Sequence, residues 1–170
     1  MQSIIYKGPG KFAIEDRPKP IIKKADDVMI KVLGVCICGT DINIFATPQK
    51  HPSRPGIIFG HEFCGQVVEV GEAVTSLKPG DKVIVDPHGP CGYCDACRAG
   101  LPEMCKNLYL DEPGLEGQAN AMGVFKDGGL TSYTLVPEKF AYKIAADTPA
   151  ELMALAEPLA CCGYSLEKLN

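Results

Sequence analysis

The sequence Cys91-Gly92-Tyr93-Cys94-Asp95-Ala96-Cys97, followed by Cys105, brings four thiols into a stretch of fifteen residues. This spacing lets the first three cysteines wrap one ion through tight turns while the fourth returns to complete a tetrahedron. Two disulfides or an iron–sulfur cluster are the alternatives, and the type of ligand favours zinc. Because four thiolates leave no open position for a substrate, the stretch predicts a structural zinc site at Cys91, Cys94, Cys97 and Cys105.

The region around these cysteines, from about residue 86 to residue 123, has no hydrophobic periodicity and contains prolines at positions 87, 90, 102 and 113. A long loop without secondary structure is costly to order unless something cross-links it. A bound metal ion provides such a cross-link. We therefore expect these residues to form a protruding zinc lobe.

Outside this lobe, short runs rich in Val and Ile alternate with Gly and Pro, which is typical of β-strands joined by turns. In the run that begins at Val28 both alternating sets of residues are largely apolar, which predicts a strand buried on both faces, as in a small barrel or sandwich. The fold is expected to be mainly β with short helices. The expected strands are Ser3–Tyr6, Phe12–Glu15, Val28–Val35, Gln66–Val70, Lys82–Val85 and Tyr133–Val136.

The last part of the sequence predicts two helices. Thr148-Pro149-Ala150-Glu151 has the pattern of a capping box with Pro at the first helical position, and it predicts a helix that runs through Ala156. Pro158 disfavours helical geometry at Glu157 and can itself begin a second helix toward Leu169. Glu157 is therefore expected at the junction between the two helices.

The composition excludes several classes of function. The net charge of -4 comes without a basic stripe, so no nucleic-acid partner is expected. There is no secretory signal pattern, and no apolar stretch approaches the roughly 20 residues that cross a bilayer, so we expect no membrane partner and a cytoplasmic location. The nine cysteines are an odd number with metal-ligand spacing, which favours reduced thiols over a disulfide framework.

A second group of potential metal ligands lies upstream of the lobe. Cys38-Gly39-Thr40-Asp41 and Gly60-His61-Glu62 together offer a sulfur, a nitrogen and a carboxylate. Catalytic zinc sites use this mixture of ligands when they keep one position open for water or substrate.

Several motifs in this order resemble the catalytic domain of zinc-dependent medium-chain alcohol dehydrogenases, in particular the sorbitol, or polyol, and threonine dehydrogenase branch. The resemblance implies a GroES-like, partly open β-barrel over residues 1–170, with the zinc lobe at about 86–123. The family's C-terminal Rossmann domain is expected to be absent from this truncated chain, because no G-x-G-x-x-G turn occurs in it. The motifs are Val35-Cys36-Ile37-Cys38-Gly39-Thr40-Asp41, Phe59-Gly60-His61-Glu62-Phe63-Cys64-Gly65, Gly80-Asp81-Lys82-Val83, the four-cysteine lobe and Ala156-Glu157-Pro158-Leu159.

The resemblance also implies roles for individual residues. Cys38 and His61 would hold a catalytic zinc, with Glu157 or Glu62 as the acidic ligand. Thr40 would hydrogen-bond the bound alcohol and start a proton relay. Asp41 would receive the other ring N–H of His61.

One position departs from the family pattern. Many members carry a histidine two residues after the aspartate, as the next step of the relay, and this sequence has Asn43 there. An amide cannot act as a base, so the proton is expected to leave through water or the cofactor ribose. His51 and His88 lie in Pro- and Gly-rich loops and are expected to be solvated.

The function implied by the resemblance is oxidation of a secondary alcohol or polyol by hydride transfer to NAD or NADP. Two zinc ions are expected per chain, one catalytic and one structural, and no cofactor-binding residues are expected within the chain. These 170 residues alone are therefore expected to give no turnover. The alternative is a non-enzymatic zinc-binding scaffold or association module. Exposed leucines at positions 159, 166 and 169 would favour a homo-oligomer.

Overall fold

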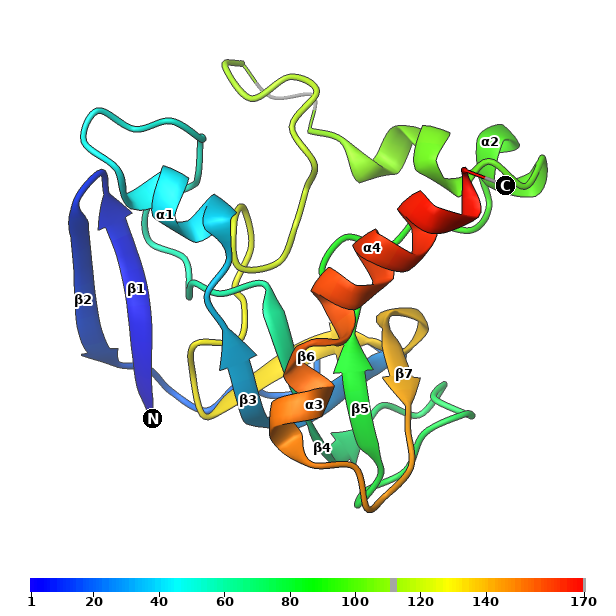
Figure 1. Cartoon of the computed structure of the whole chain (residues 1–170). Helices are drawn as coiled ribbons and strands as arrows, with labels where there is room; N and C mark the ends of the chain where they lie inside the picture. The colour runs from blue at the N-terminus through cyan, green and yellow to red at the C-terminus, as the bar shows by residue number, and fades with distance from the viewer. Residues whose placement is uncertain (111–112, 170) are drawn as a thin grey trace.

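The computed structural model describes residues 1–110 and 113–169. Asp111 and Glu112, which belong to the predicted lobe, and Asn170 lie outside the described residues. The described part of the chain is mainly β, with short helices placed around and between two sheets (Figure 1).

The strands form a hairpin and a larger sheet, and neighbouring strands are antiparallel in both. In the larger sheet the order is β6-β3-β4-β5-β7, so β6 and β7 are its two edges and the barrel is not closed. The hairpin consists of β1 (Gln2–Gly8) and β2 (Lys11–Asp16), and the sheet of β3 (Asp27–Cys36), β4 (Glu62–Val70), β5 (Lys82–Val85), β6 (Tyr133–Pro137) and β7 (Ala141–Lys143).

The hairpin is fixed to the segment that leads into β4. The backbone N–H of Phe59 donates to the carbonyl oxygen of Ile4 at 3.0 Å, and the N–H of Tyr6 donates to the carbonyl oxygen of Ile57 at 3.1 Å. On the same edge, the N–H of Ile4 donates to Leu130 at 2.9 Å. These bonds hold the chain just before His61 against the rigid hairpin.

The helices are short. They are α1 (Gly39–Phe45), α2 (Asp95–Arg98), α3 (Ala150–Ala154) and α4 (Ala156–Glu167), with 3-10 turns η1 (Pro102–Met104), η2 (Lys106–Leu108) and η3 (Glu138–Phe140). Helix α2 and the turns η1 and η2 lie in the cysteine lobe, which projects away from the sheet near the end of α4 (Figure 1).

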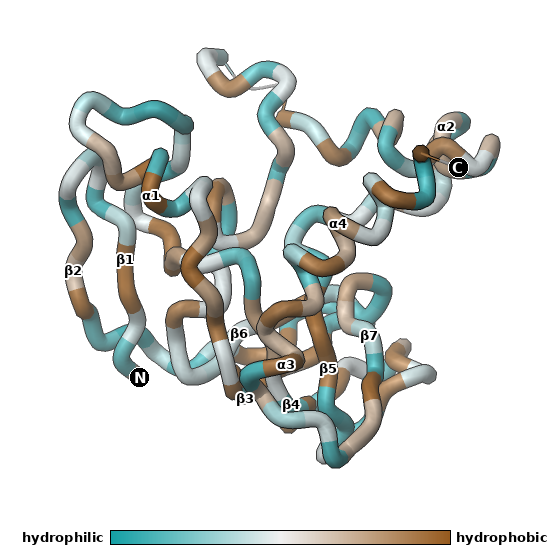
Figure 2. The backbone as a smooth tube through the Cα atoms, in the orientation of Figure 1, coloured by the Kyte–Doolittle hydropathy of each residue, from teal (hydrophilic) through white to brown (hydrophobic). Residues whose placement is uncertain are grey.

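Two apolar clusters form most of the core. One lies on the larger sheet and includes Val28, Ile30, Phe63 and Val83. The other joins the hairpin to α1 and to the loop that follows the cysteine lobe, and it includes Tyr6, Ile44, Phe59 and Phe125. Figure 2 shows hydrophobic stretches on β5 and on α3, and α3 contacts β3 and β4. The second cluster supports both α1 and the segment that leads to His61.

The predicted strands all lie within observed ones, but two details differ. Strand β7 was not expected, since three residues are too few to show a pattern. Strand β3 is buried on both faces only as far as Ile30, whereas Lys31 and Leu33 are exposed. The reason is that α3 covers only one face of the second half of β3. On that face the packing is close, since a Cβ added at Gly34 would lie 3.2 Å from the carbonyl oxygen of Ala150.

The helix junction also differs from the prediction. Helix α3 ends at Ala154, and α4 begins at Ala156, so Glu157 lies inside the first turn of α4 and not between the helices. Pro158 is tolerated at the third helical position because N–H groups of the first turn have no helical partner. No side-chain bond caps α3, so the capping box expected from Thr148 is not formed.

Leu159, Leu166 and Leu169 are all exposed on or just after α4. Among the described residues, no helix combines the length and the apolar character that spanning a bilayer requires.

Candidate metal centres

In each of the two predicted ligand sets, the structure brings the members close to one another. Within each set, one ligand atom per residue can be chosen so that all chosen atoms lie within 4.8 Å of one another. One set is Cys91, Cys94, Cys97 and Cys105, and the other is Cys38, His61 and Glu62.

The four-cysteine set has the dimensions of a tetrahedral zinc site. The Sγ atoms of Cys94 and Cys97 are 3.5 Å apart, and those of Cys91 and Cys97 are 3.9 Å apart. Four sulfurs bound about 2.3 Å from one zinc ion lie about 3.8 Å apart. A disulfide would need about 2.05 Å, so the thiols are arranged for a metal and not for cross-linking.

Backbone N–H groups stabilise thiolates in this lobe. The N–H of Cys94 points at Sγ of Cys91 at 3.4 Å, and the N–H of Cys91 points at Sγ of Cys105 at 3.3 Å. Burial opposes ionisation of Cys91, but hydrogen bonds from the backbone of Tyr93 and Cys94 outweigh it and lower the pKa to about 6. Burial and the neighbouring thiols raise the pKa of Cys97 to about 12.

A lysine distant in sequence also contacts the lobe. The Nζ atom of Lys139 donates to the carbonyl oxygen of Cys91 at 3.0 Å and to that of Pro90 at 3.3 Å. Its positive charge lies beside a site that would carry excess negative charge with zinc bound. Nothing in the local sequence pattern could have identified this residue.

The second set of ligands is positioned by α1 and β4. Cys38 is the residue that caps the N-terminus of α1, and Glu62 is the first residue of β4. Between them, Gly60 has a φ of +90°, which favours glycine, and an added Cβ there would lie 2.8 Å from Cγ of Leu130. This turn directs His61 and Glu62 into the interior, where they are 6% and 5% exposed.

Asp41 connects two residues of this set. Its Oδ2 accepts the backbone N–H of Cys38 at 2.9 Å, and its Oδ1 lies 3.2 Å from Nδ1 of His61. The second contact becomes an ion pair only when His61 is protonated, and it does not meet the geometry of a hydrogen bond. Burial would lower the pKa of His61, but Asp41, Glu157 and Glu62 outweigh it and raise the pKa. With Nδ1 facing Asp41, Nε2 is the ring nitrogen left to bind a metal.

Cys38, His61 and Glu62 line a cavity of about 370 Å³, which also has apolar walls. Thr40 from α1 and Glu157 from α4 lie on its surface. Glu157 does not join the group of atoms within 4.8 Å, so the structure places Glu62, and not Glu157, next to Cys38 and His61. Burial raises the pKa of Glu157, and nearby Glu62 adds to this effect.

Two histidines that sequence reasoning assigned to solvated loops also line this cavity. His51 is half-buried, whereas His88 is exposed, with its Nδ1 3.2 Å from Oδ1 of Asp86. Their loops fold back from distant parts of the sequence, so no local spacing revealed them.

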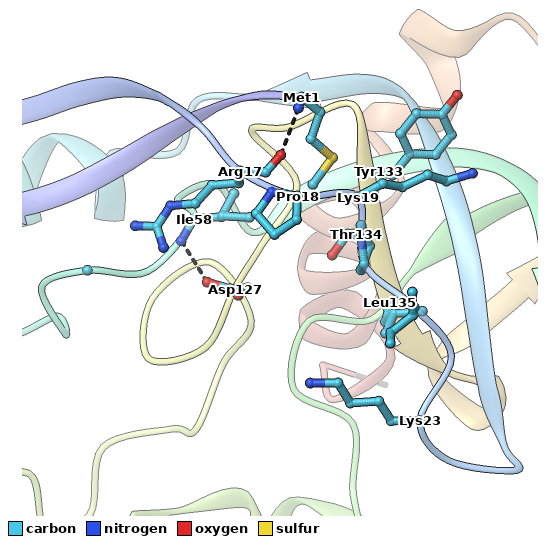
Figure 3. Close-up of a pocket in the computed structure, with 13 residues that line it drawn as sticks. Met1, Arg17, Pro18, Lys19, Lys23, Ile58, Asp127, Tyr133, Thr134 and Leu135 are labelled. Carbon is cyan, nitrogen blue, oxygen red and sulfur yellow. Dashed lines mark hydrogen bonds between the residues drawn. The ribbon is translucent and has the colours of Figure 1, made fainter.

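A different cavity, of about 620 Å³, lies at the base of the hairpin (Figure 3). Arg17, Lys19 and Lys23 line it, but their charged ends point in different directions. Its Asp127 already accepts the N–H of Ile58 at 2.8 Å. This cavity contains no convergent chemistry comparable with that around His61.

The comparisons with known proteins agree with this geometry. Residues 24–146 match the family model described as the alcohol dehydrogenase GroES-like domain. The L-threonine 3-dehydrogenase of Thermococcus kodakarensis is 40% identical over 164 residues, which cover 94% of this chain and 43% of the relative. The D-xylulose reductase A of Aspergillus oryzae is 32% identical over 170 residues, covering 99% of this chain and 45% of the relative.

Among solved structures, a protein of Sinorhizobium meliloti described as a zinc-binding dehydrogenase, bound to NADP, superposes with a TM-score of 0.81. It is 34% identical, and the match covers 98% of this chain and 44% of that one. The present chain therefore spans less than half the length of the proteins that it resembles.

Proposed function

The chain belongs to the alcohol dehydrogenase GroES-like domain family, and from this premise we propose that it is the zinc-binding catalytic part of an NAD(P)-dependent alcohol or polyol dehydrogenase. The proposal rests on one observation: Cys38, His61 and Glu62 offer three different ligand atoms within 4.8 Å of one another, at the wall of a cavity. A purely structural zinc site would be closed, as the four-cysteine lobe is.

The donor set fits a catalytic zinc ion. One thiolate and one carboxylate balance the charge of the dication, and a neutral imidazole supplies the third bond. We propose Cys38, His61 and Glu62 as ligands, with Glu157 as a second carboxylate across the cavity. A zinc ion held there would act as a Lewis acid on the oxygen of an alcohol.

The other residues prepare the site for this chemistry. Asp41 fixes the tautomer and orientation of His61, since its carboxylate faces Nδ1 at 3.2 Å. The hydroxyl of Thr40 lies at the same cavity and can pass on the alcohol proton. The four-cysteine lobe is proposed to hold a second, structural zinc ion.

The substrate class follows from the cavity and from the names of the relatives. Thr40, His51, Glu62, His88 and Glu157 line the wall, which suits a substrate with more than one hydroxyl group. Relatives named for L-threonine and D-xylulose support a secondary alcohol of this polar kind. The hydride acceptor is proposed to be NAD or NADP, bound outside these 170 residues.

Cobalt substitution tests the proposal, because Co²⁺ in a thiolate site absorbs visible light and reports its ligands. Addition of propan-2-ol or a polyol is expected to change the spectrum of the cobalt-loaded chain. Cys38→Ser should abolish this change, whereas Cys36→Ser, on the preceding strand and outside the ligand set, should keep it. If neither the addition of alcohol nor the substitution Cys38→Ser changed the spectrum of the cobalt-loaded chain, the result would contradict an open catalytic site.

Turnover is a separate question. We propose that the chain alone reduces neither NAD nor NADP, because no dinucleotide-binding sequence occurs in it. Appreciable formation of NADH or NADPH from a polyol by the purified chain would disprove this part.

A further inference from the structure

His51 occupies a position in the cavity that the proposed function does not yet use. It comes from the loop between α1 and β4 and is half-buried. The cavity that it lines also contains Cys38, His61 and Thr40. With a volume of about 370 Å³, this cavity has room for a small alcohol and a few waters, each of about 30 Å³. His51 and the proposed metal ligands therefore line the same cavity, in which a substrate and water molecules can lie between them.

The ring of His51 has a defined tautomer. Its Nδ1 lies 2.7 Å from the carbonyl oxygen of Pro52. A carbonyl oxygen can only accept a hydrogen bond, so Nδ1 must carry the hydrogen. The neutral ring then has its lone pair on Nε2, which is the form that a proton acceptor needs.

The loop that carries His51 is held in place from several sides. Nε2 of Gln49 donates to the carbonyl oxygen of His51 at 2.7 Å and to the hydroxyl of Tyr6 at 3.0 Å. Tyr6 is a core residue, only 1% exposed. On the other side of His51, Oγ of Ser53 donates to Val124 at 2.7 Å. The imidazole is thus supported by the second core cluster.

The same loop is bonded to the end of α1. The backbone N–H of Lys50 donates to the carbonyl oxygen of Asn43 at 3.0 Å. Asn43 is three residues after Thr40 on α1, and its amide side chain cannot accept a proton as a base. The fold therefore brings a basic imidazole from the next loop to the helix that carries Thr40.

The other titratable groups at this cavity are less suited to accept the proton. Glu62 belongs to the proposed ligand set. The side chain of His88 is 44% exposed and faces Asp86. Glu157 interacts with the thiol of Cys161, whose Sγ is 3.9 Å from Oε1.

We propose that His51 is the proton acceptor of alcohol oxidation at this site, an inference that rests on the proposed function. The O–H bond of the alcohol breaks, and its proton passes to Nε2 of His51 directly or through the hydroxyl of Thr40. A bound nicotinamide would accept the hydride of the carbinol C–H bond as the C=O bond forms. The imidazolium then returns its proton to solvent.

The test uses the zinc-loaded chain with ¹⁵N-labelled histidines and millimolar trifluoroethanol, an acidic alcohol that needs no nicotinamide. Before addition, the ring nitrogens of His51 are expected to show the Nδ1–H tautomer. After addition, the Nε2 signal should move toward the imidazolium position, because Nε2 now takes up the hydrogen of the bound alcohol. The signal is assigned by its loss in His51→Gln, and Cys162→Ser, an exposed position on α4 outside the cavity lining, should leave the response unchanged.

Two outcomes overturn the inference in distinguishable ways. If trifluoroethanol changes the spectrum of the cobalt-loaded chain but the Nε2 signal of His51 does not move, the proton goes elsewhere and the proposed function survives. If cobalt gives no alcohol-sensitive spectrum, the proposed function fails and the inference fails with it.

Discussion

Oδ1 of Asp41 lies 3.2 Å from Nδ1 of His61, and both side chains are almost completely buried. The other carboxylate oxygen accepts the backbone N–H of Cys38, so one residue orients two proposed metal ligands. A buried carboxylate in this position costs free energy unless the imidazole and a metal compensate for it.

Replacing Asp41 by Asn should therefore weaken metal binding at the cavity by about 10- to 100-fold, as is typical for such supporting residues. Competition with a chromophoric chelator measures the affinity. Asp86→Asn is the matched control, because Asp86 also lies 3.2 Å from a histidine Nδ1, that of His88, outside the ligand set. Equal affinities in both variants and the parent chain would remove the role given to Asp41.

The four-cysteine lobe should depend on metal for its stability. Cys105 is fully buried, and Cys105→Ser is expected to lose one zinc ion and to lower Tm by roughly 10 °C, since metal-binding free energy is folding free energy there. Cys162→Ser, at an exposed position on α4, should change neither quantity. Differential scanning calorimetry with metal analysis checks this, and an unchanged Tm for Cys105→Ser would argue against a structural zinc.

The thiols of the metal-free lobe should differ in reactivity. With its pKa lowered to about 6, Cys91 is mostly thiolate at pH 7, whereas Cys97, with a pKa raised to about 12, is a neutral thiol. Brief alkylation with iodoacetamide should modify Cys91 faster than Cys97. Labelling of Cys91 should fall as pH drops through about 6. Peptide mapping by mass spectrometry measures both, and equal rates would contradict the hydrogen bonding described for Cys91.

Gly60 should tolerate no side chain. Gly60 and Gly80 both have positive φ, but an added Cβ meets Leu130 at 2.8 Å at Gly60 and nothing within 4 Å at Gly80. Gly80→Ala should cost about 1–2 kcal/mol through backbone strain alone, and Gly60→Ala about 1–3 kcal/mol more through overpacking. Urea unfolding compares them. If the two variants are equally stable, Gly60 does not set the path of the chain into His61.

The sequence predicted those parts of the fold that depend on local pattern. Val and Ile runs located six strands, and the spacing of Cys91, Cys94 and Cys97 located the lobe, because both signals lie in neighbouring residues. The three-residue strand β7 and the exposure of Leu33 on β3 depend on which other segments pack against these strands. Glu157 lies inside α4, and not at the predicted junction, because the first turn of a helix accepts a proline such as Pro158.

The candidate site was predictable to the same extent. Its proposed ligands lie in two short motifs, and the structure places Cys38, His61 and Glu62 together. The positions of His51 and Lys139 depend on residues distant in the sequence. His51 lines the cavity around His61, and Lys139 donates to the carbonyl oxygen of Cys91. No spacing in the sequence encodes such contacts.

The most direct measurement is the number of zinc ions bound per chain after purification without chelator, in the parent chain and in Cys38→Ser. We predict two zinc ions in the parent chain and one in the variant, which keeps the four-cysteine lobe. A single zinc in both proteins would mean that only the lobe binds metal, and it would contradict a preformed catalytic site in favour of a zinc-binding scaffold.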